Sequence, residues 1–150
     1  MKTKTTIIEI TQEDIVNVLA DVLYSCYWLS YDYDIEDYNK LENKSNDDCV
    51  EDKLAKLLLA GKSITLVDTY AEDEDYVNEE LEHEWDEELG GMAYKVTIDD
   101  FKRGIEKCLN SDEMYKRDGA YKVLFTDGEA DCEDANIVVQ TIVLGDYIYG

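Results

Sequence analysis

The sequence lacks the residues and motifs on which most enzymes depend. It contains one histidine, His83, and it has no glycine-rich phosphate loop, no Gly-x-Ser-x-Gly segment and no His-Glu-x-x-His segment. Catalysis requires positioned acids, bases, nucleophiles or a cofactor loop. The sequence therefore predicts a protein that is not an enzyme and that binds no cofactor.

Long apolar runs are also missing. No run approaches the roughly 18 residues of a membrane-spanning helix. The opening residues, MKTKTTIIEI, alternate polar with apolar residues instead of forming the apolar region of a signal peptide. We therefore expect a cytoplasmic protein with no membrane partner.

Closely spaced cysteines are absent as well, since the chain has four cysteines and no Cys-x-x-Cys pair. Cysteines that lie far apart in a cytoplasmic chain are expected to be unbridged thiols, mostly buried. We predict no metal site. A structural zinc site is the alternative, and it would require the fold to bring distant ligands together. The candidate ligands for that alternative are Cys26, Cys49, Cys108, Cys132 and His83.

Positive charge is scarce, because 14 Lys and Arg residues face 37 Asp and Glu residues and the net charge is −23. A net charge of this size affects partners and association rates rather than the fold. It disfavours nucleic acid and anionic membrane as partners. It favours basic surfaces, above all the channels in which other proteins hold nucleic acid. Acidity that serves only salt tolerance or solubility is the alternative explanation.

The acidic residues are most concentrated between residues 72 and 88, where eleven carboxylates occur in seventeen residues without one Lys or Arg. Such a block is either solvated and disordered or an ordered negative surface. Apolar residues every fourth position, from Val77 to Leu89, favour a helix that ends at the Gly90-Gly91 pair. Its charges would lie about 2.3 Å apart along the axis, against about 1.7 Å for duplex DNA. The carboxylates predicted to bind a partner are Glu72, Asp73, Glu74, Asp75, Glu79, Glu80, Glu82, Glu84, Asp86, Glu87 and Glu88.

Residues 27–48 are rich in Tyr, Asp, Glu and Asn, which is typical of an irregular surface segment. Tyr31, Tyr33 and Tyr38 are further candidates for partner contact, because aromatic residues beside carboxylates are favoured in protein interfaces. The alternative is that these tyrosines cover the core from outside.

The length of 150 residues and the 45% hydrophobic content predict a single domain over residues 1–150. Hydrophobic periodicity and capping signals predict helices that start at Thr11, near Asn46 to Asp48, at Thr97 or Asp99, and at Asp131. Strands are predicted at residues 5–10, 63–67, 92–98, 121–125 and 147–149, with the second and third of these paired. The predicted fold class is therefore α+β, with a small antiparallel sheet, about four helices and an acidic helical insert over residues 69–91.

Half of the basic residues lie between Lys95 and Lys122. We interpret this cluster as neutralising acidic neighbours within the fold, and a site for ligand phosphate is the alternative. Its central members are Lys102, Arg103, Lys107, Lys116 and Arg117.

The last twenty residues, DCEDANIVVQTIVLGDYIYG, resemble the closing segment of a group of small uncharacterised proteins from tailed phages and prophages of gut Firmicutes. Those proteins typically end in D-A-D-x-I-V-Q-x-A-L-F-G-x-I-V-Y-G. The segment YKVT with Phe101, Gly104 and Ile105, and the opening ITQEDI followed by YW, are also similar. Most matching positions are fold positions, so the resemblance implies a phage origin and no particular activity. The C-terminal matches are Asp131, Asp134, Val138, Val139, Gln140, Leu144, Gly145, Ile148, Tyr149 and Gly150.

Where those proteins usually have a short acidic turn between the second and third strands, this chain has the insert. We therefore place any added function there. The charge and the resemblance together favour a phage inhibitor of a host defence complex, either an anti-CRISPR or an anti-restriction protein, whose carboxylates mimic nucleic acid in a basic channel. The expected partner is thus a CRISPR effector or a restriction enzyme in the infected cell. The alternative is a binding protein without mimicry, such as a sponge for an immune signalling molecule or a regulatory or morphogenesis protein.

Overall fold

The computed structural model describes residues 9–72, 76–126 and 128–150. Six helices and a four-stranded antiparallel sheet form an α+β fold, as predicted. The elements are α1 (Gln12–Ser25), β1 (Leu29–Asp32), α2 (Ile35–Asn39), α3 (Val50–Leu59), β2 (Ile64–Asp68), β3 (His83–Asp86), β4 (Gly91–Val96), α4 (Ile98–Leu109), α5 (Met114–Phe125) and α6 (Cys132–Leu144).

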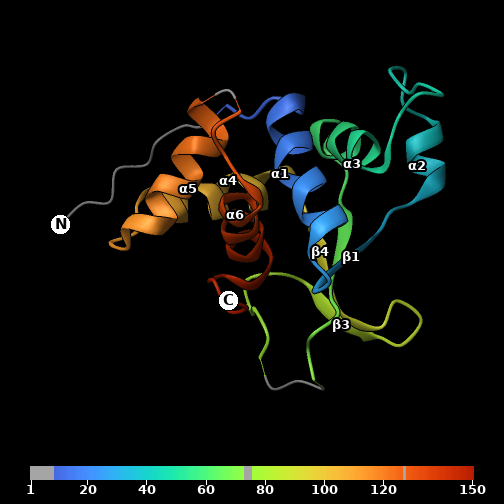
Figure 1. Cartoon of the computed structure of the whole chain (residues 1–150). Helices are drawn as coiled ribbons and strands as arrows, with labels where there is room; N and C mark the ends of the chain where they lie inside the picture. Colours follow the sequence, from blue (N-terminus) through green and yellow to red (C-terminus); the bar gives the residue numbers. More distant parts are fainter. Residues whose placement is uncertain (1–8, 73–75, 127) are drawn as a thin grey trace.

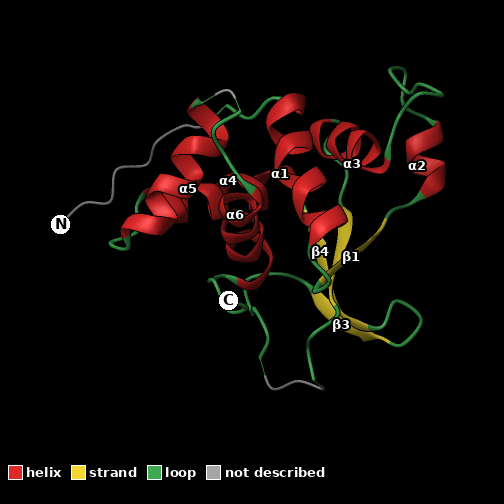
Figure 2. Cartoon of the chain, in the orientation of Figure 1, coloured by secondary structure: helices red, strands yellow, loops and turns green. Residues whose placement is uncertain are grey.

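Most of the helices lie to one side of the sheet, and α6 is at the centre of the helical layer among α1, α4 and α5 (Figures 1 and 2). Helix α6 is buried continuously from Ala135 to Leu144. A helix that is apolar on all sides belongs in the interior of a domain. The prediction that this helix is central is therefore confirmed.

The sheet has the order β1-β2-β4-β3, so β1 and β3 are its edge strands. Strands β2 and β4 pair antiparallel, with Leu66 opposite Tyr94. This confirms the predicted pairing of residues 63–67 with residues 92–98. The side chains of one sheet face, including Ile64, Leu66 and Tyr94, enter the main core.

Local signals placed the predicted helix starts correctly at three positions. Thr11, Thr97 and Asp131 each accept a hydrogen bond from the backbone N–H three residues later and complete a capping box. The predicted helix end at Gly61 is also confirmed, since Gly61 follows α3 with a φ of +82°. Helix α1, however, ends at Ser25 and not near Trp28.

The predicted acidic helix over residues 72–88 is wrong. The described part of this stretch contains no helix, and β3 pairs with β4 through a turn in which Gly90 has a φ of +79°. Gly91 is needed for close packing, because a Cβ there would lie 2.1 Å from the backbone oxygen of Asp68. A strand directs Glu82, Glu84 and Asp86 to one side, whereas a helix would crowd like charges on successive turns.

Several other expectations from the sequence are corrected. Residues 121–125 belong to α5 and not to a strand. Residues 27–48 contain β1 and α2, and residues 147–149 form no strand. The predicted strand at residues 5–10 lies mostly outside the described residues, and its last two residues are not in a strand.

Three members of the basic cluster, Arg103, Lys107 and Lys116, pair with acidic neighbours, in line with our interpretation. Lys116 is buried and contacts Asp146 at 2.5 Å and Glu113 at 3.2 Å. The hydrogen bond from Lys116 lowers the pKa of Asp146. Arg103 pairs with Asp100, Lys107 pairs with Glu80, and Arg117 donates to the backbone oxygen of Ser111.

Self-repulsion is expected to limit the stability of the fold, because a net charge far from zero destabilises a compact state. The melting temperature should therefore rise between low salt and about 0.5 M NaCl, where the Debye length is well under 10 Å. A variant with Glu42, Asp112 and Glu129 changed to Lys has a net charge of −17 and should gain less from salt. A melting temperature that stays constant or falls as NaCl is added would contradict this expectation.

Candidate functional site

The face of the sheet that points away from the main core is the candidate interaction surface, and we call it the outer sheet face. Side chains alternate between the two faces of a strand. The pairing therefore directs Asp32 of β1, Thr65 of β2, Lys95 of β4 and Glu84 of β3 to this face. At its centre Val67 and Ala93 are buried outside the main core cluster.

Three carboxylates of this face lie in a row along one edge of the sheet, and one carboxylate lies at the other edge. Glu82, Glu84 and Asp86 project from β3 and the residue before it, at intervals of about 6.8 Å. Asp32 lies across the sheet on β1. Among the described residues, Lys95 is the only Lys or Arg that lines the depression between them, and it pairs with Glu82 at 3.6 Å.

The depression has a volume of about 390 Å³ and is open to solvent. The side chains of Asp32, Glu84 and Asp86 line it with Ser63 and Thr65. Leu89, from the turn after β3, lines it beside Ala93. The charge and the polar lining suit a cationic group better than a phosphate.

The other predicted carboxylates occupy the two loops that flank β3. Glu72, Glu79 and Glu80 are exposed before the strand, and Glu87 and Glu88 are exposed in the turn after it. Asp73, Glu74 and Asp75 lie outside the described residues. The loop before β3 is held by buried Asn78, which donates to the backbone oxygen of Val143 at 2.9 Å.

The three tyrosines predicted to bind a partner pack on the domain itself. Tyr38 is buried and donates a 2.5 Å hydrogen bond to Asp48. Tyr31 and Tyr33 are partly buried against the core. The alternative, that these residues cover the core, describes them better than partner contact.

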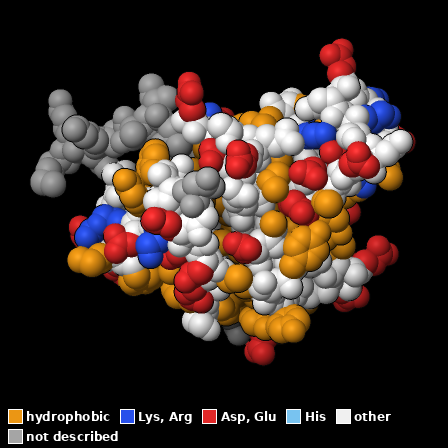
Figure 3. Space-filling view, turned by 45° about the horizontal axis from the view of Figure 1, so that its top comes forward, with side chains coloured by type: hydrophobic (Ala, Val, Ile, Leu, Met, Phe, Trp, Pro, Cys, Tyr) orange, Lys and Arg blue, Asp and Glu red, His pale blue; other side chains and the backbone are white. Residues whose placement is uncertain are grey.

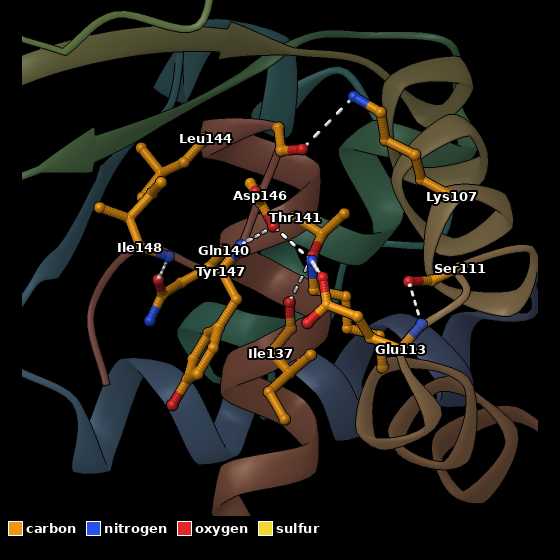
Figure 4. Close-up of polar contacts among 12 residues, drawn as sticks. Lys107, Ser111, Glu113, Ile137, Gln140, Thr141, Leu144, Asp146, Tyr147 and Ile148 are labelled. Carbon is orange, nitrogen blue, oxygen red and sulfur yellow. Dashed lines mark hydrogen bonds and ion pairs between the residues drawn. The ribbon is translucent and has the colours of Figure 1, made fainter.

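A buried polar network, which the sequence did not predict, fixes the C-terminal residues to α6 (Figure 4). The side-chain oxygen of Gln140 accepts from the backbone N–H groups of Ile148 and Tyr149, both at 2.8 Å. Its amide nitrogen donates to the Tyr149 backbone oxygen at 2.8 Å and to Asn136 at 3.2 Å. Asn136 also accepts from the Trp28 indole at 2.7 Å.

The same network reaches the sheet through Tyr149, whose hydroxyl donates to Asp68 at 2.7 Å. Burial raises the pKa of Asp68, although the hydrogen bonds from Tyr149 and from the Tyr70 backbone oppose this. Gln140 and Tyr149 therefore have structural roles in this chain, and Gly145 ends α6 with a φ of +82°. These are among the positions on which the phage-protein resemblance rests.

A second surface feature that the sequence analysis missed is an exposed apolar stripe on α5. Met114, Tyr121 and Phe125 are 65%, 56% and 60% exposed, respectively, and the rings of Tyr121 and Phe125 lie 5.3 Å apart. In Figure 3, apolar and basic side chains occur together at the α5 end, whereas carboxylates are spread over much of the visible face. Because we predicted a strand at residues 121–125, we did not identify this helical face from the sequence.

The cysteines and the histidine do not form the alternative zinc site within the described residues. Cys108 is buried, Cys26 is partly buried, and Cys49 and Cys132 are exposed, so the expectation of mostly buried thiols is only partly correct. Burial raises the pKa of the Cys108 thiol. His83 Nδ1 lies 2.8 Å from the backbone oxygen of Leu81. Within residues 9–72, 76–126 and 128–150, no group of three His, Cys, Asp or Glu side chains could hold a metal ion.

No protein-family model, curated protein or solved structure matches this chain. In the part of the chain that the structure describes, no helix has the length and apolar character needed to cross a membrane.

Proposed function

We propose that this protein is a non-catalytic phage inhibitor that binds the basic nucleic-acid surface of a host defence protein in the cytoplasm of the infected cell. A CRISPR effector or a restriction enzyme has such a surface. The observation that carries the proposal is the outer sheet face, where Asp32, Glu82, Glu84 and Asp86 surround a depression with one lysine. A cationic channel would meet complementary charge there, with Lys95, which pairs with Glu82, as the competing cation.

The strand geometry changes how closely this surface resembles nucleic acid. Carboxylates along β3 are spaced by about 6.8 Å along the strand axis, about twice the 3.4 Å that separates the charges of one DNA strand along the helix axis. The turn after β3 adds the exposed side chains of Glu87 and Glu88 next to this strand, whereas Glu80 in the loop before it pairs with Lys107. The proposal therefore depends on charge complementarity over a broad surface and not on a match to the duplex.

A sponge for an immune signalling nucleotide fits the same surface poorly, because Lys95 already pairs with Glu82 and the other charged side chains of the depression are carboxylates. Phosphate groups would be repelled. The α5 stripe supports a different second candidate, a regulatory or morphogenesis protein that binds through an apolar face.

The test is competition with DNA for purified CRISPR effectors and restriction enzymes. We expect the parent protein to displace DNA from at least one of them, with an association rate that falls steeply as salt rises. Changing Asp32, Glu82 and Glu84 to Lys should weaken this binding about tenfold or more at low salt. Asp86 is left unchanged because its side chain accepts from the Leu89 backbone at 3.0 Å.

The matched control changes Glu42, Asp112 and Glu129 to Lys. These three side chains are exposed, do not line the depression, and alter the net charge by the same amount. The control should keep most of the affinity. Equal losses in both variants would mean that net charge alone acts, and absence of competition with every enzyme would reject the proposed function.

A further inference from the structure

Among the residues that the structure describes, strand β3 has one neighbour, so its second backbone edge is open to an added strand. It lies at the end of the sheet, and its one pairing within residues 9–72, 76–126 and 128–150 is with β4. The backbone N–H of Lys95 donates to the oxygen of Glu82 at 2.9 Å, which identifies Glu82 and Lys95 as a hydrogen-bonded pair. Such pairs alternate along an antiparallel ladder. Glu84 and Asp86 therefore direct their backbone groups to β4, and His83 and Trp85 direct theirs to the open edge.

The side chains at this edge differ between the two faces of the sheet. The carboxylates of Glu82 and Glu84 are exposed on the outer sheet face. Trp85 points to the opposite face, where it remains 41% exposed. An added strand would place its own side chains about 4.5–5.5 Å from these residues. Basic side chains would meet the carboxylates on one face, and an apolar side chain between them would meet Trp85.

We propose that the open edge of β3 accepts an extended, basic segment of the partner as a fifth strand of the sheet. This inference rests on the proposed function, because it assumes a partner with a basic surface, and it specifies how that partner is held. Backbone hydrogen bonds would provide affinity and the alternating pattern of basic and apolar side chains would provide specificity. Pairing of an extended segment on β3 also requires no rearrangement of the hairpin.

The charges at this edge also explain why a second copy of the chain is a poor occupant. Charged side chains protect edge strands from pairing with copies of themselves, since like charges directly opposite each other are destabilising. The same charges attract a basic strand. The other edge strand, β1, has Asp32 as its only carboxylate on the outer sheet face, so β3 is the more selective edge for cations.

The probe is a capped seven-residue peptide in which lysine and valine alternate. We expect it to bind the parent protein and to slow amide hydrogen exchange of His83 and Trp85 at least tenfold. Two derivatives carry N-methyl groups on all lysine or on all valine amides. Because one set of amides must face β3, at least one derivative should bind ten or more times more weakly. A glutamate-valine peptide should not bind.

Two variants of the protein, rather than of the peptide, test the same edge. His83→Pro removes a backbone donor that faces the open edge and none that pairs with β4, a position at which edge strands tolerate proline. His83→Ala removes the same imidazole and keeps the donor. Peptide affinity should fall about fivefold or more for His83→Pro relative to His83→Ala.

Equal binding of both N-methylated derivatives, or unchanged exchange at His83 and Trp85 in the saturated complex, would overturn strand addition. The exchange measurement uses the parent protein, so it decides the question even if His83→Pro fails to fold. Strand addition stands if the peptide pairs with β3 while no defence protein competes with DNA, and the proposed function alone then fails. If a defence protein competes with DNA but the peptide does not pair with β3, only strand addition is rejected.

Discussion

Lys56→Met is expected to lower the free energy of unfolding by about 3–5 kcal/mol, because it leaves a buried carboxylate without its cation. Lys56 Nζ contacts the two carboxylate oxygens of Asp48 at 2.7 and 2.9 Å, and both side chains are less than a tenth exposed. Lys56 also donates to the backbone oxygen of Asn43 at 2.7 Å. The loss should appear as a lower urea midpoint in equilibrium unfolding.

The pH dependence separates this cause from a simple loss of packing. Burial opposes the charged form of Asp48, yet hydrogen bonds from Lys56, Tyr38 and the Ser45 backbone hold its pKa below the usual value. In the parent, the stability that Asp48 contributes is present above about pH 4 and is lost as the pH falls through the lowered pKa. Without Lys56, protonation relieves the buried charge, so the deficit of the variant should shrink between pH 7 and about pH 4.

Two further variants serve as controls for Lys56→Met. Lys53→Met changes a lysine one turn earlier in α3, which lies over the rings of Tyr33 and Tyr38 and forms no ion pair with any carboxylate that the structure describes. It should cost about 1 kcal/mol or less. Asp48→Asn combined with Lys56→Met should recover at least 1 kcal/mol of the loss. A double variant no more stable than Lys56→Met would show that lost packing, and not the unpaired charge, dominates.

Gln140→Leu is expected to cost about 3–5 kcal/mol, because unsatisfied buried polar groups cost about 1–3 kcal/mol each. The substitution keeps most of the volume of a fully buried side chain but removes the partners of the Ile148 and Tyr149 backbones. The C-terminal residues should then detach from α6. Carboxypeptidase should remove them from the folded variant faster than from the parent.

Trp28 reports the same change, because its ring packs against Tyr149 with 6.0 Å between centroids. With Trp85→Phe in the background, Trp28 is the single tryptophan, and its emission should shift to longer wavelength in Gln140→Leu. Thr141→Val is the control, since Thr141 is equally central in α6 but donates within its own helix, to Ile137 at 2.8 Å. It should cost about 1 kcal/mol or less. Similar losses of stability for both variants would contradict the idea that Gln140 holds the C-terminal residues on α6.

The secondary structure of the acidic stretch was not determined by its local sequence pattern. The apolar residues from Val77 to Leu89 fit a helical period of four, but Leu81, His83 and Trp85 also fit the period of two of a strand. Only the pairing with β4, through hydrogen bonds that no local pattern encodes, decides between these periods. The prediction of a strand at residues 121–125 was wrong because this short, mostly apolar run belongs to α5, which packs against α4 and α6.

Capping boxes at Thr11, Thr97 and Asp131, the glycine at residue 61 and the apolar α6 segment were predictable because each is set within a few residues of chain. The sign and size of the surface charge were also determined by the sequence alone, since they are sums over residues. The position of that charge on the surface was not determined by the sequence alone. Asp32 and Glu84 share one face only because strands distant in sequence pair in one register. The open edge of β3 likewise exists only in the assembled sheet, because an edge is defined by the neighbour that a strand lacks.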